Sequence, residues 1–180
     1  EKYTLFNRPD VFVASAAAHA SMDDEIIRGP IYESTRQAGF EAVTWLDAGT
    51  RNFYTVNTPS ETLEDLKGLK IRVQQSPTNV EMMGRLGGSA TPMGFGEVYT
   101  SLQSHIIDGA ENTEMALTDT GHGDVCQYSS YDIHQMIPDI LTGKKEGEEG
   151  VRREERAILH HGLPMFKRVP RAEWDNAVQV

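Results

Sequence analysis

The sequence is poor in cysteine, because Cys126 is the single cysteine among its 180 residues. An internal disulfide is therefore impossible, and a zinc site built from several cysteine thiolates is excluded. This usage is compatible with a bacterial cytoplasm and with a periplasmic protein that needs no disulfides. We expect Cys126 to be a small core side chain rather than a nucleophile.

Long apolar runs are absent as well. No such run reaches the roughly 18 residues that a membrane-spanning helix requires. The chain starts at Glu1 and shows no signal peptide. We therefore expect it to be processed or truncated at the N-terminus, so this end does not reveal the compartment.

Positive charge is scarce, because the sequence has 17 lysines and arginines against 27 acidic residues, which gives a formal net charge of −10. This balance argues against nucleic acid, whose phosphates need a basic footprint, and against an anionic membrane surface. A small anion is not excluded, because one arginine in a cleft outweighs a distant field. The hydrophobic fraction of 38% indicates a globular chain, long enough for one domain or parts of two.

A regular alternation of strand and helix signals lies between Leu69 and Leu117. We expect strands over 69–73, 89–93 and 106–107, and helices over 77–86, 97–104 and 115–120. This order predicts a parallel sheet with crossover helices. Ligands of such sheets bind beyond the carboxyl ends of the strands.

Local signals set the ends of these elements. Ser76 and Pro77 are a strong helix start, and the expected apolar face of that helix is Val80, Met83 and Leu86. Asp108-Gly109 predicts a turn that leads to Asn112, which is expected to cap the next helix.

The flanking regions give weaker patterns. Asp47-Ala48-Gly49-Thr50 has turn composition and predicts a break between two strands. The other expected elements are a helix over 22–37 that stops at Gly39, strands over 40–46 and 51–56, a short helix over 62–66, β-structure over 125–136 and 139–141, a charged connection over 144–156, and helices over 154–161 and 172–178.

The strand LKIRV (69–73) carries an arginine at its carboxyl end, followed at once by the polar run QQSP. Arg72 alternates with Leu69 and Val73, so it points away from their apolar face. Asn112 lies at the end of the next-but-one strand. We expect both polar side chains to face one crevice.

Two stretches of this sequence are characteristic of a known family. They are DAGTRNFYT (47–55) and LEDLKGLKIRVQQSPTNVEMMGRLGGSATPMGFGEVYTSLQSHIIDGAEN (63–112). With them the chain resembles the solute-binding proteins of tripartite ATP-independent periplasmic (TRAP) transporters, the DctP-like family. The match extends more loosely from Tyr3 to Leu141 and weakens after Thr142.

The resemblance implies a periplasmic-binding-protein-like α/β fold with two lobes and mixed, mainly parallel sheets, of which the chain covers about two thirds. Residues 1–50 would be a remnant of lobe I, 51–136 lobe II, and 137–180 the return to lobe I and C-terminal helices. Such proteins capture a small organic acid between the lobes. They are periplasmic monomers without catalysis or cofactor, and they deliver the acid to the small and large membrane subunits of the permease.

The resemblance also implies a ligand site. Arg72 is the arginine of the KIRV motif that pairs with the ligand carboxylate, through two parallel hydrogen bonds that lysine cannot reproduce. The other site residues that it implies, some only by position near the cleft, are Arg51, Asn112, Phe95 and His134. Gln74, with Gln75 and Thr91, is expected to line the cleft.

Other interpretations stay open at this point. An α/β enzyme using His134 or Cys126 is one, although the sequence has no nucleophile elbow, phosphate loop or paired acid and base. A structural fragment without binding competence is another. His105, Asp108 and Glu111 are three residues apart, so on one helix their side chains would share a face and could bind a metal. Asp108-Gly109 breaks such a helix, and we therefore expect no metal site. The adjacent His160-His161 diverge on a helix.

The identity of the acid is not determined by these residues. C4-dicarboxylates, sugar acids such as uronates, and 2-oxo or aromatic acids are all compatible with two arginines and an amide. The amides of Gln74 and Gln75 suit hydroxyl groups, which favours sugar acids.

Overall fold

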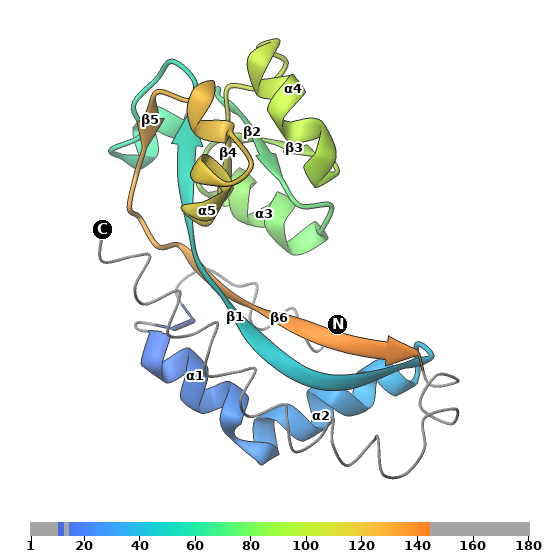
Figure 1. The fold of residues 1–180 in the computed structure, drawn as a ribbon. Coiled ribbons are helices and arrows are strands. Elements are labelled where there is room, and N and C mark those ends of the chain that lie inside the picture. Colours follow the sequence, from blue (N-terminus) through green and yellow to red (C-terminus); the bar gives the residue numbers. More distant parts are fainter. Residues whose placement is uncertain (1–10, 13–14, 145–180) are drawn as a thin grey trace. The chain divides into compact units, whose positions relative to one another are not determined.

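The computed structural model of the chain describes residues 11–12 and 15–144. These residues form two compact units. The first unit holds 15–49 and 137–144, and the second holds 11–12 and 50–136. Two paired strands, β1 (Phe40–Thr55) and β6 (Gln135–Lys144), contribute to both units (Figure 1). No described helix is both long and apolar enough to cross a membrane.

The first unit begins with two helices where the sequence predicts one. Helix α1 spans Ser15–Asp23 and α2 spans Glu25–Arg36. The predicted helix over 22–37 is confirmed over 25–36, but its start is wrong, because Asp24 is the N-cap of α2, with extended backbone and a carboxylate that accepts from the Ile26 amide at 2.8 Å. Gly39 follows α2 at φ 81°, so the predicted stop is confirmed.

The second unit is built on a mixed sheet in the order β3-β2-β4-β1-β5. Strand β2 (Lys70–Val73) pairs in parallel with β3 (Ser89–Pro92) and β4 (Gly109–Asn112). Strand β1 runs antiparallel to β4 and to β5 (Tyr128–Ser129). The predicted parallel order is therefore confirmed for β2, β3 and β4, and β1 makes the sheet mixed.

Short helices connect these strands and lie beside the sheet in Figure 1. They are α3 (Pro77–Arg85), α4 (Val98–Gln103), α5 (Met115–Thr118), and the 3₁₀ turns η2 (Leu63–Leu66), η3 (Phe95–Glu97) and η4 (His122–Asp124). Helix α3 starts at Pro77, as Ser76-Pro77 predicts. Its buried face is Asn79, Met82 and Met83, whereas Val80 is 37% exposed, so the predicted face is wrong at Val80.

The core of the second unit lies on both faces of β1. Adjacent residues of a strand point to opposite faces, so Phe53 and Tyr54 enter different apolar clusters. The Phe53 cluster also holds Leu66, Ile71, Val73 and Met83. The Tyr54 cluster also holds Val56, Val98, Leu102, Ile107 and Ala110. Cys126 packs against the latter cluster, and burial raises the pKa of its thiol to about 12, which makes a thiolate nucleophile scarce.

Two predicted turns lie wholly or partly in strands. Strand β1 continues through 47–50, where Gly49 takes φ 80° and donates its amide to Asp47 Oδ1 at 2.9 Å. Turn chemistry is thus present, but it only interrupts the extended backbone locally. Strand β4 starts at Gly109, so the expected strand at 106–107 is wrong, and of the predicted turn Asp108-Gly109 only Asp108 lies in a bend. A Cβ at Gly109 would lie 2.5 Å from the Tyr54 carbonyl oxygen, so glycine permits the close approach of β4 to β1.

The predictions for the region after β4 are confirmed only in part. Glu114, not Asn112, occupies the N-cap position of α5, because Asn112 is still in β4. Only β5 and the start of β6 are strands within the expected β-structure over 125–136. The expected helices over 154–161 and 172–178, and most of the charged connection over 144–156, lie outside the described residues.

Candidate functional site

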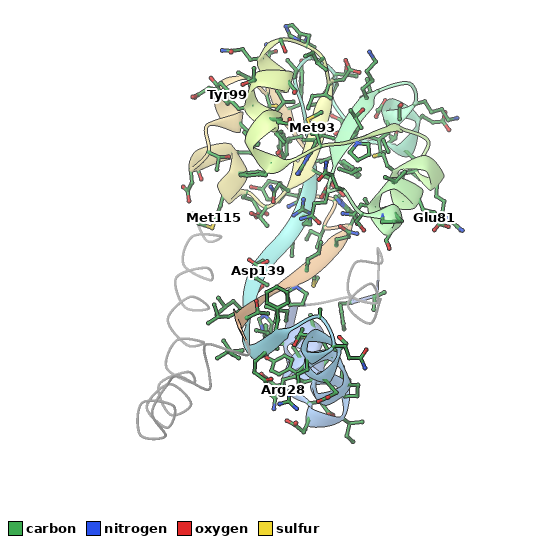
Figure 2. All side chains as sticks on the ribbon, turned by 90° about the vertical axis from the view of Figure 1, so that its right-hand side faces the viewer. Arg28, Glu81, Met93, Tyr99, Met115 and Asp139 are labelled. Carbon is green, nitrogen blue, oxygen red and sulfur yellow. The ribbon has the colours of Figure 1, made fainter. Side chains whose placement is uncertain are left out.

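Arg72 lies near the carboxyl end of β2, where the sequence places it. Arg72 is 3% exposed, and its Nε and Nη2 donate to the Met93 carbonyl oxygen at 3.2 and 3.0 Å. Met93, labelled in Figure 2, lies directly after β3. Within the described part of the chain, no carboxylate lies within ion-pair distance of Arg72. Burial lowers the pKa of Arg72, although a guanidinium stays charged at any relevant pH.

Arg51 presents the opposite case on strand β1, which β4 separates from β2 in the sheet. It is 6% exposed, and its Nε donates to Glu111 Oε2 in a buried ion pair. Its Nη2 donates to the Glu111 carbonyl oxygen at 2.8 Å, and its Nη1 donates to Asn112 Oδ1 at 3.1 Å. The antiparallel register of β1 and β4 explains this meeting, because Asn52 lies opposite Asn112 and Phe53 opposite Glu111. The charge of Arg51 is thus neutralised within the unit.

His134 joins the Arg51–Glu111 pair. Its Nε2 lies 3.7 Å from Glu111 Oε2, and its Nδ1 hydrogen-bonds Asp132 Oδ2. The imidazole also stacks on Phe53, with ring centroids 4.3 Å apart and an interplanar angle of 18°. Nε2 itself is buried and makes no hydrogen bond in the described part of the chain.

The pKa shifts in this network follow from burial and charge. Burial of Glu111 favours its neutral form, but the charge of Arg51 and the nearby His134 outweigh this, and the pKa of Glu111 is lowered. Burial likewise disfavours the His134 imidazolium, but the carboxylates of Asp132 and Glu111 raise the pKa of His134. The pKa of Asp132 is lowered, because His134 outweighs the effect of burial. The network therefore places Arg51 and His134 beside the carboxylates of Glu111 and Asp132.

The other predicted site residues lie in the same unit. Asn112 Oδ1 accepts from Arg51 and from the Thr113 amide, which fixes the side-chain amide at the end of β4. Phe95 is 45% exposed, with its ring centroid 5.8 Å from Arg72 Cζ. Gln74 follows β2 and accepts from Asn79 Nδ2 at 3.2 Å. Gln75 and Thr91 also belong to this unit, at the ends of β2 and β3.

Sequence reasoning missed several polar residues of this region. Glu111 was considered only as a metal ligand, whereas the structure pairs it with Arg51. Asp132 gave no local signal, and nothing near His122 in the sequence predicts its burial beside Tyr54. No group of three or more His, Cys, Asp and Glu side chains in the described ranges is placed to hold a metal ion.

Known proteins match nearly the whole chain. The family model described as bacterial extracellular solute-binding protein, family 7 (DctP) matches residues 1–179. An uncharacterised protein, YiiZ of Salmonella typhimurium, is 40% identical over 99% of this chain and 54% of its own length. The 2,3-diketo-L-gulonate-binding periplasmic protein YiaO of Escherichia coli is 29% identical over 86% of this chain and 47% of its length.

Solved structures of TRAP periplasmic solute-binding proteins have the same fold. The protein from Anaerococcus prevotii, with bound α/β-D-glucuronate, is 59% identical, with a TM-score of 0.92 over 97% of this chain and 57% of that one. The protein from Sulfitobacter, with bound β-D-galacturonate, is 32% identical, with a TM-score of 0.91 over 96% and 57%.

The chain therefore spans somewhat more than half the length of these structures, less than the two thirds expected from the resemblance. The predicted two-lobe α/β class is confirmed by the fold match. The family consists of solute-binding proteins, which disfavours the enzyme interpretation. With the family model matching from residue 1 to 179, this chain belongs to the DctP family of bacterial extracellular solute-binding proteins.

Proposed function

We propose that the full-length protein binds a sugar acid of the uronate type and that Arg72 holds its carboxylate. The observation that carries this proposal is the state of Arg72. It is a buried cation that donates to one carbonyl oxygen and has no carboxylate partner among the described residues. Arg51, equally buried, already has its carboxylate.

The energetics favour an external anion at Arg72. Burying an unpaired charge is costly, and a carboxylate that arrives with a ligand offsets that cost. A charge-assisted hydrogen bond contributes about 1.5–3 kcal/mol. In a site closed to water, loss of the guanidinium would leave the ligand charge unpaired and cost about 3–5 kcal/mol.

The remaining predicted residues suit the hydroxyl groups of a uronate. Asn112 uses its Oδ1 within the protein, which leaves its Nδ2 as a donor for the ligand. Gln74 lies just after Arg72 at the end of β2. His134 is a further predicted ligand residue, whose buried Nε2 makes no hydrogen bond in the described residues and lies 3.7 Å from Glu111 Oε2. Arg51 acts by holding Asn112, and Phe95 packs against the ligand beside Arg72.

Relatives support the ligand class. The structures from Anaerococcus prevotii and Sulfitobacter contain glucuronate and galacturonate, both monocarboxylic sugar acids. Among more distant matches, a sialic acid-binding periplasmic protein of Vibrio cholerae is 46% identical over 69 residues. All of these names describe acids with one carboxylate and several hydroxyls.

The role of the whole protein follows from its family. We infer that the two compact units belong to lobe I, with 1–50 and 137–180, and lobe II, with 51–136. The acid is captured in the periplasm by the monomer and delivered to the small and large subunits of a TRAP permease. A family described as extracellular supports this location.

The test is calorimetry on the full-length protein with D-glucuronate, D-galacturonate and succinate. We expect a uronate to bind at micromolar Kd or tighter and without turnover. Arg72→Lys should weaken binding by two orders of magnitude or more, which is about 3 kcal/mol. Arg85→Lys, on the exposed side of α3, is the matched control and should leave Kd unchanged.

Other results would contradict the proposal in defined ways. Full affinity in Arg72→Lys would mean that the carboxylate is held elsewhere. Strong binding of succinate with no binding of either uronate would replace the sugar acid with a C4-dicarboxylate. Catalysed conversion of a bound acid would overturn the assignment as a binding protein.

A further inference from the structure

A buried histidine adjoins the Arg72 region and has no part in the proposed site so far. His122 begins η4 and is 2% exposed. Its ring centroid lies 5.5 Å from that of Phe95, 5.6 Å from that of Tyr54 and 6.5 Å from that of Tyr99, a residue labelled in Figure 2. We call Tyr54, Phe95, Tyr99 and His122 the aromatic cluster.

The aromatic cluster and Arg72 share one side chain. The Phe95 ring centroid lies within 6 Å of both the Arg72 guanidinium carbon and the His122 ring centroid. Phe95 is also the half-exposed member of this group. Phe95 therefore adjoins both the Arg72 guanidinium and the His122 ring.

The hydrogen bond between Tyr54 and His122 defines the tautomer of the imidazole. Tyr54 Oη lies 2.7 Å from His122 Nδ1, and it is the single hydrogen bond of Tyr54's hydroxyl within the described residues. Tyr54 is 1% exposed. If Nδ1 carried the hydrogen, the buried phenol hydrogen would lack an acceptor, which is costly. The favourable arrangement has the Tyr54 hydroxyl donating to Nδ1, so Nε2 carries the hydrogen.

Two shifts support a neutral pair. Burial of the Tyr54 phenol raises its pKa, so the hydroxyl keeps its hydrogen. Burial, followed by the charge of Arg72, lowers the pKa of His122, so the imidazole stays neutral near pH 7.

The Nε2–H group has no partner inside the described part of the protein. Its single hydrogen bond there is made at Nδ1. Yet Nε2 is not one of the buried polar atoms that lack a hydrogen bond. The small exposed part of His122 therefore includes Nε2, which is a neutral donor reachable from outside in a ring that is otherwise enclosed.

We propose that His122 Nε2–H donates a hydrogen bond to an oxygen of the acid held by Arg72. This contact favours acids that carry a second acceptor oxygen next to the carboxylate, such as the ring oxygen of a uronate. The Tyr54 hydroxyl is the positioning group that keeps the donor on Nε2. This inference rests on the proposed function of Arg72.

The experiment compares His122→Phe and His122→Gln in the full-length protein, with D-glucuronate as the probe. Phenylalanine keeps an aromatic ring beside Phe95 but has no donor, whereas glutamine can present an amide donor near the place of Nε2. We expect about a 10-fold weaker Kd for His122→Phe, the usual effect of one lost hydrogen bond. His122→Gln should recover most of that loss.

A spectroscopic readout separates ligand contact from ring packing. With ¹⁵N-labelled histidine, the free protein should show a protonated Nε2 and an unprotonated Nδ1. Addition of D-glucuronate should shift the Nε2 resonance more than the Nδ1 resonance. Tyr54→Phe should allow the hydrogen to move to Nδ1.

The possible outcomes distinguish this inference from the proposed function. If Arg72→Lys abolishes binding while His122→Phe leaves Kd unchanged, the function holds and the His122 contact is wrong. If His122→Phe and His122→Gln weaken binding equally and the ligand leaves Nε2 unshifted, packing explains the effect and the contact is also wrong. If Arg72→Lys binds normally, the proposed function itself fails.

Discussion

Two regions of the same sheet hold an arginine in different ways. Around Arg51, which lies on β1, strand β4 provides a carboxylate, a carbonyl and an amide oxygen within hydrogen-bond distance. Around Arg72, which lies on β2, the described residues provide one hydrogen-bond acceptor, the carbonyl oxygen of Met93 directly after β3. Both arginines are more than nine-tenths buried. Burial alone therefore does not distinguish the two arginines. What distinguishes them is that Arg72, unlike Arg51, has no carboxylate within ion-pair distance among the described residues, and our proposal rests on this difference.

The largest change in stability is expected when the counterion of Arg51 is removed. Glu111→Gln should destabilise the protein by about 3–5 kcal/mol, because Arg51 and His134 lose the carboxylate they share in a buried site. Urea unfolding measures this change. A loss under 1 kcal/mol would show that the buried pair contributes no more than a surface ion pair.

The His134 end of the network should give a pH dependence. Its folded pKa is raised above the ordinary 6.5, so its stabilising contribution is complete below pH 6.5 and is lost as pH rises through the folded pKa. Glu111 and Asp132 have lowered pKa values, so their contributions are present above about pH 4.5 and lost on acidification. The network is thus most stabilising between these limits.

Urea unfolding from pH 5 to pH 9 checks this sign. The difference in stability between the wild type and His134→Gln should shrink as pH rises above 6.5. Taking the difference matters because His122, with a lowered pKa, contributes with the opposite sign in both proteins. A difference that grows with pH would contradict the assigned protonation of His134.

Replacement of an exposed arginine should have the smallest effect on stability. Arg85 donates from Nε and Nη2 to Glu81 Oε1 one turn earlier on α3, and both side chains are well exposed. Arg85→Ala should therefore change stability by about 0.5 kcal/mol or less, measured by thermal unfolding. A larger loss would mean that hydrogen-bond count, rather than burial, sets the effect of these pairs.

The sequence predicts β2 and α3 because their signals are local. Alternation in LKIRV and the Ser76-Pro77 start each need only neighbouring residues. The DAGT segment misleads because Gly49 and Asp47 do make turn-like contacts, yet pairing with neighbouring strands keeps β1 continuous. Glu111 gave no usable signal, since its partner Arg51 lies 60 positions earlier in the chain.

The candidate site was predicted to a similar extent. Arg72 at the end of β2 is a matter of local pattern, and the structure places it there. The assignments of Arg51, Asn112, Phe95, Gln74 and His134 as ligand residues stay predictions, although all lie in one unit with Arg72. His122 was missed because a histidine after Gly121 has no periodicity, and its bond to Tyr54 depends on the fold.

The most direct test exchanges each buried arginine for methionine in the full-length protein and measures both unfolding in urea and affinity for D-glucuronate. We predict that Arg72→Met leaves the stability of the ligand-free protein within about 1 kcal/mol and weakens binding by two orders of magnitude or more. Arg51→Met should lower ligand-free stability by about 3–5 kcal/mol, because Glu111 is left buried without its partner. Destabilisation by Arg72→Met as large as that by Arg51→Met, with affinity retained, would contradict the account.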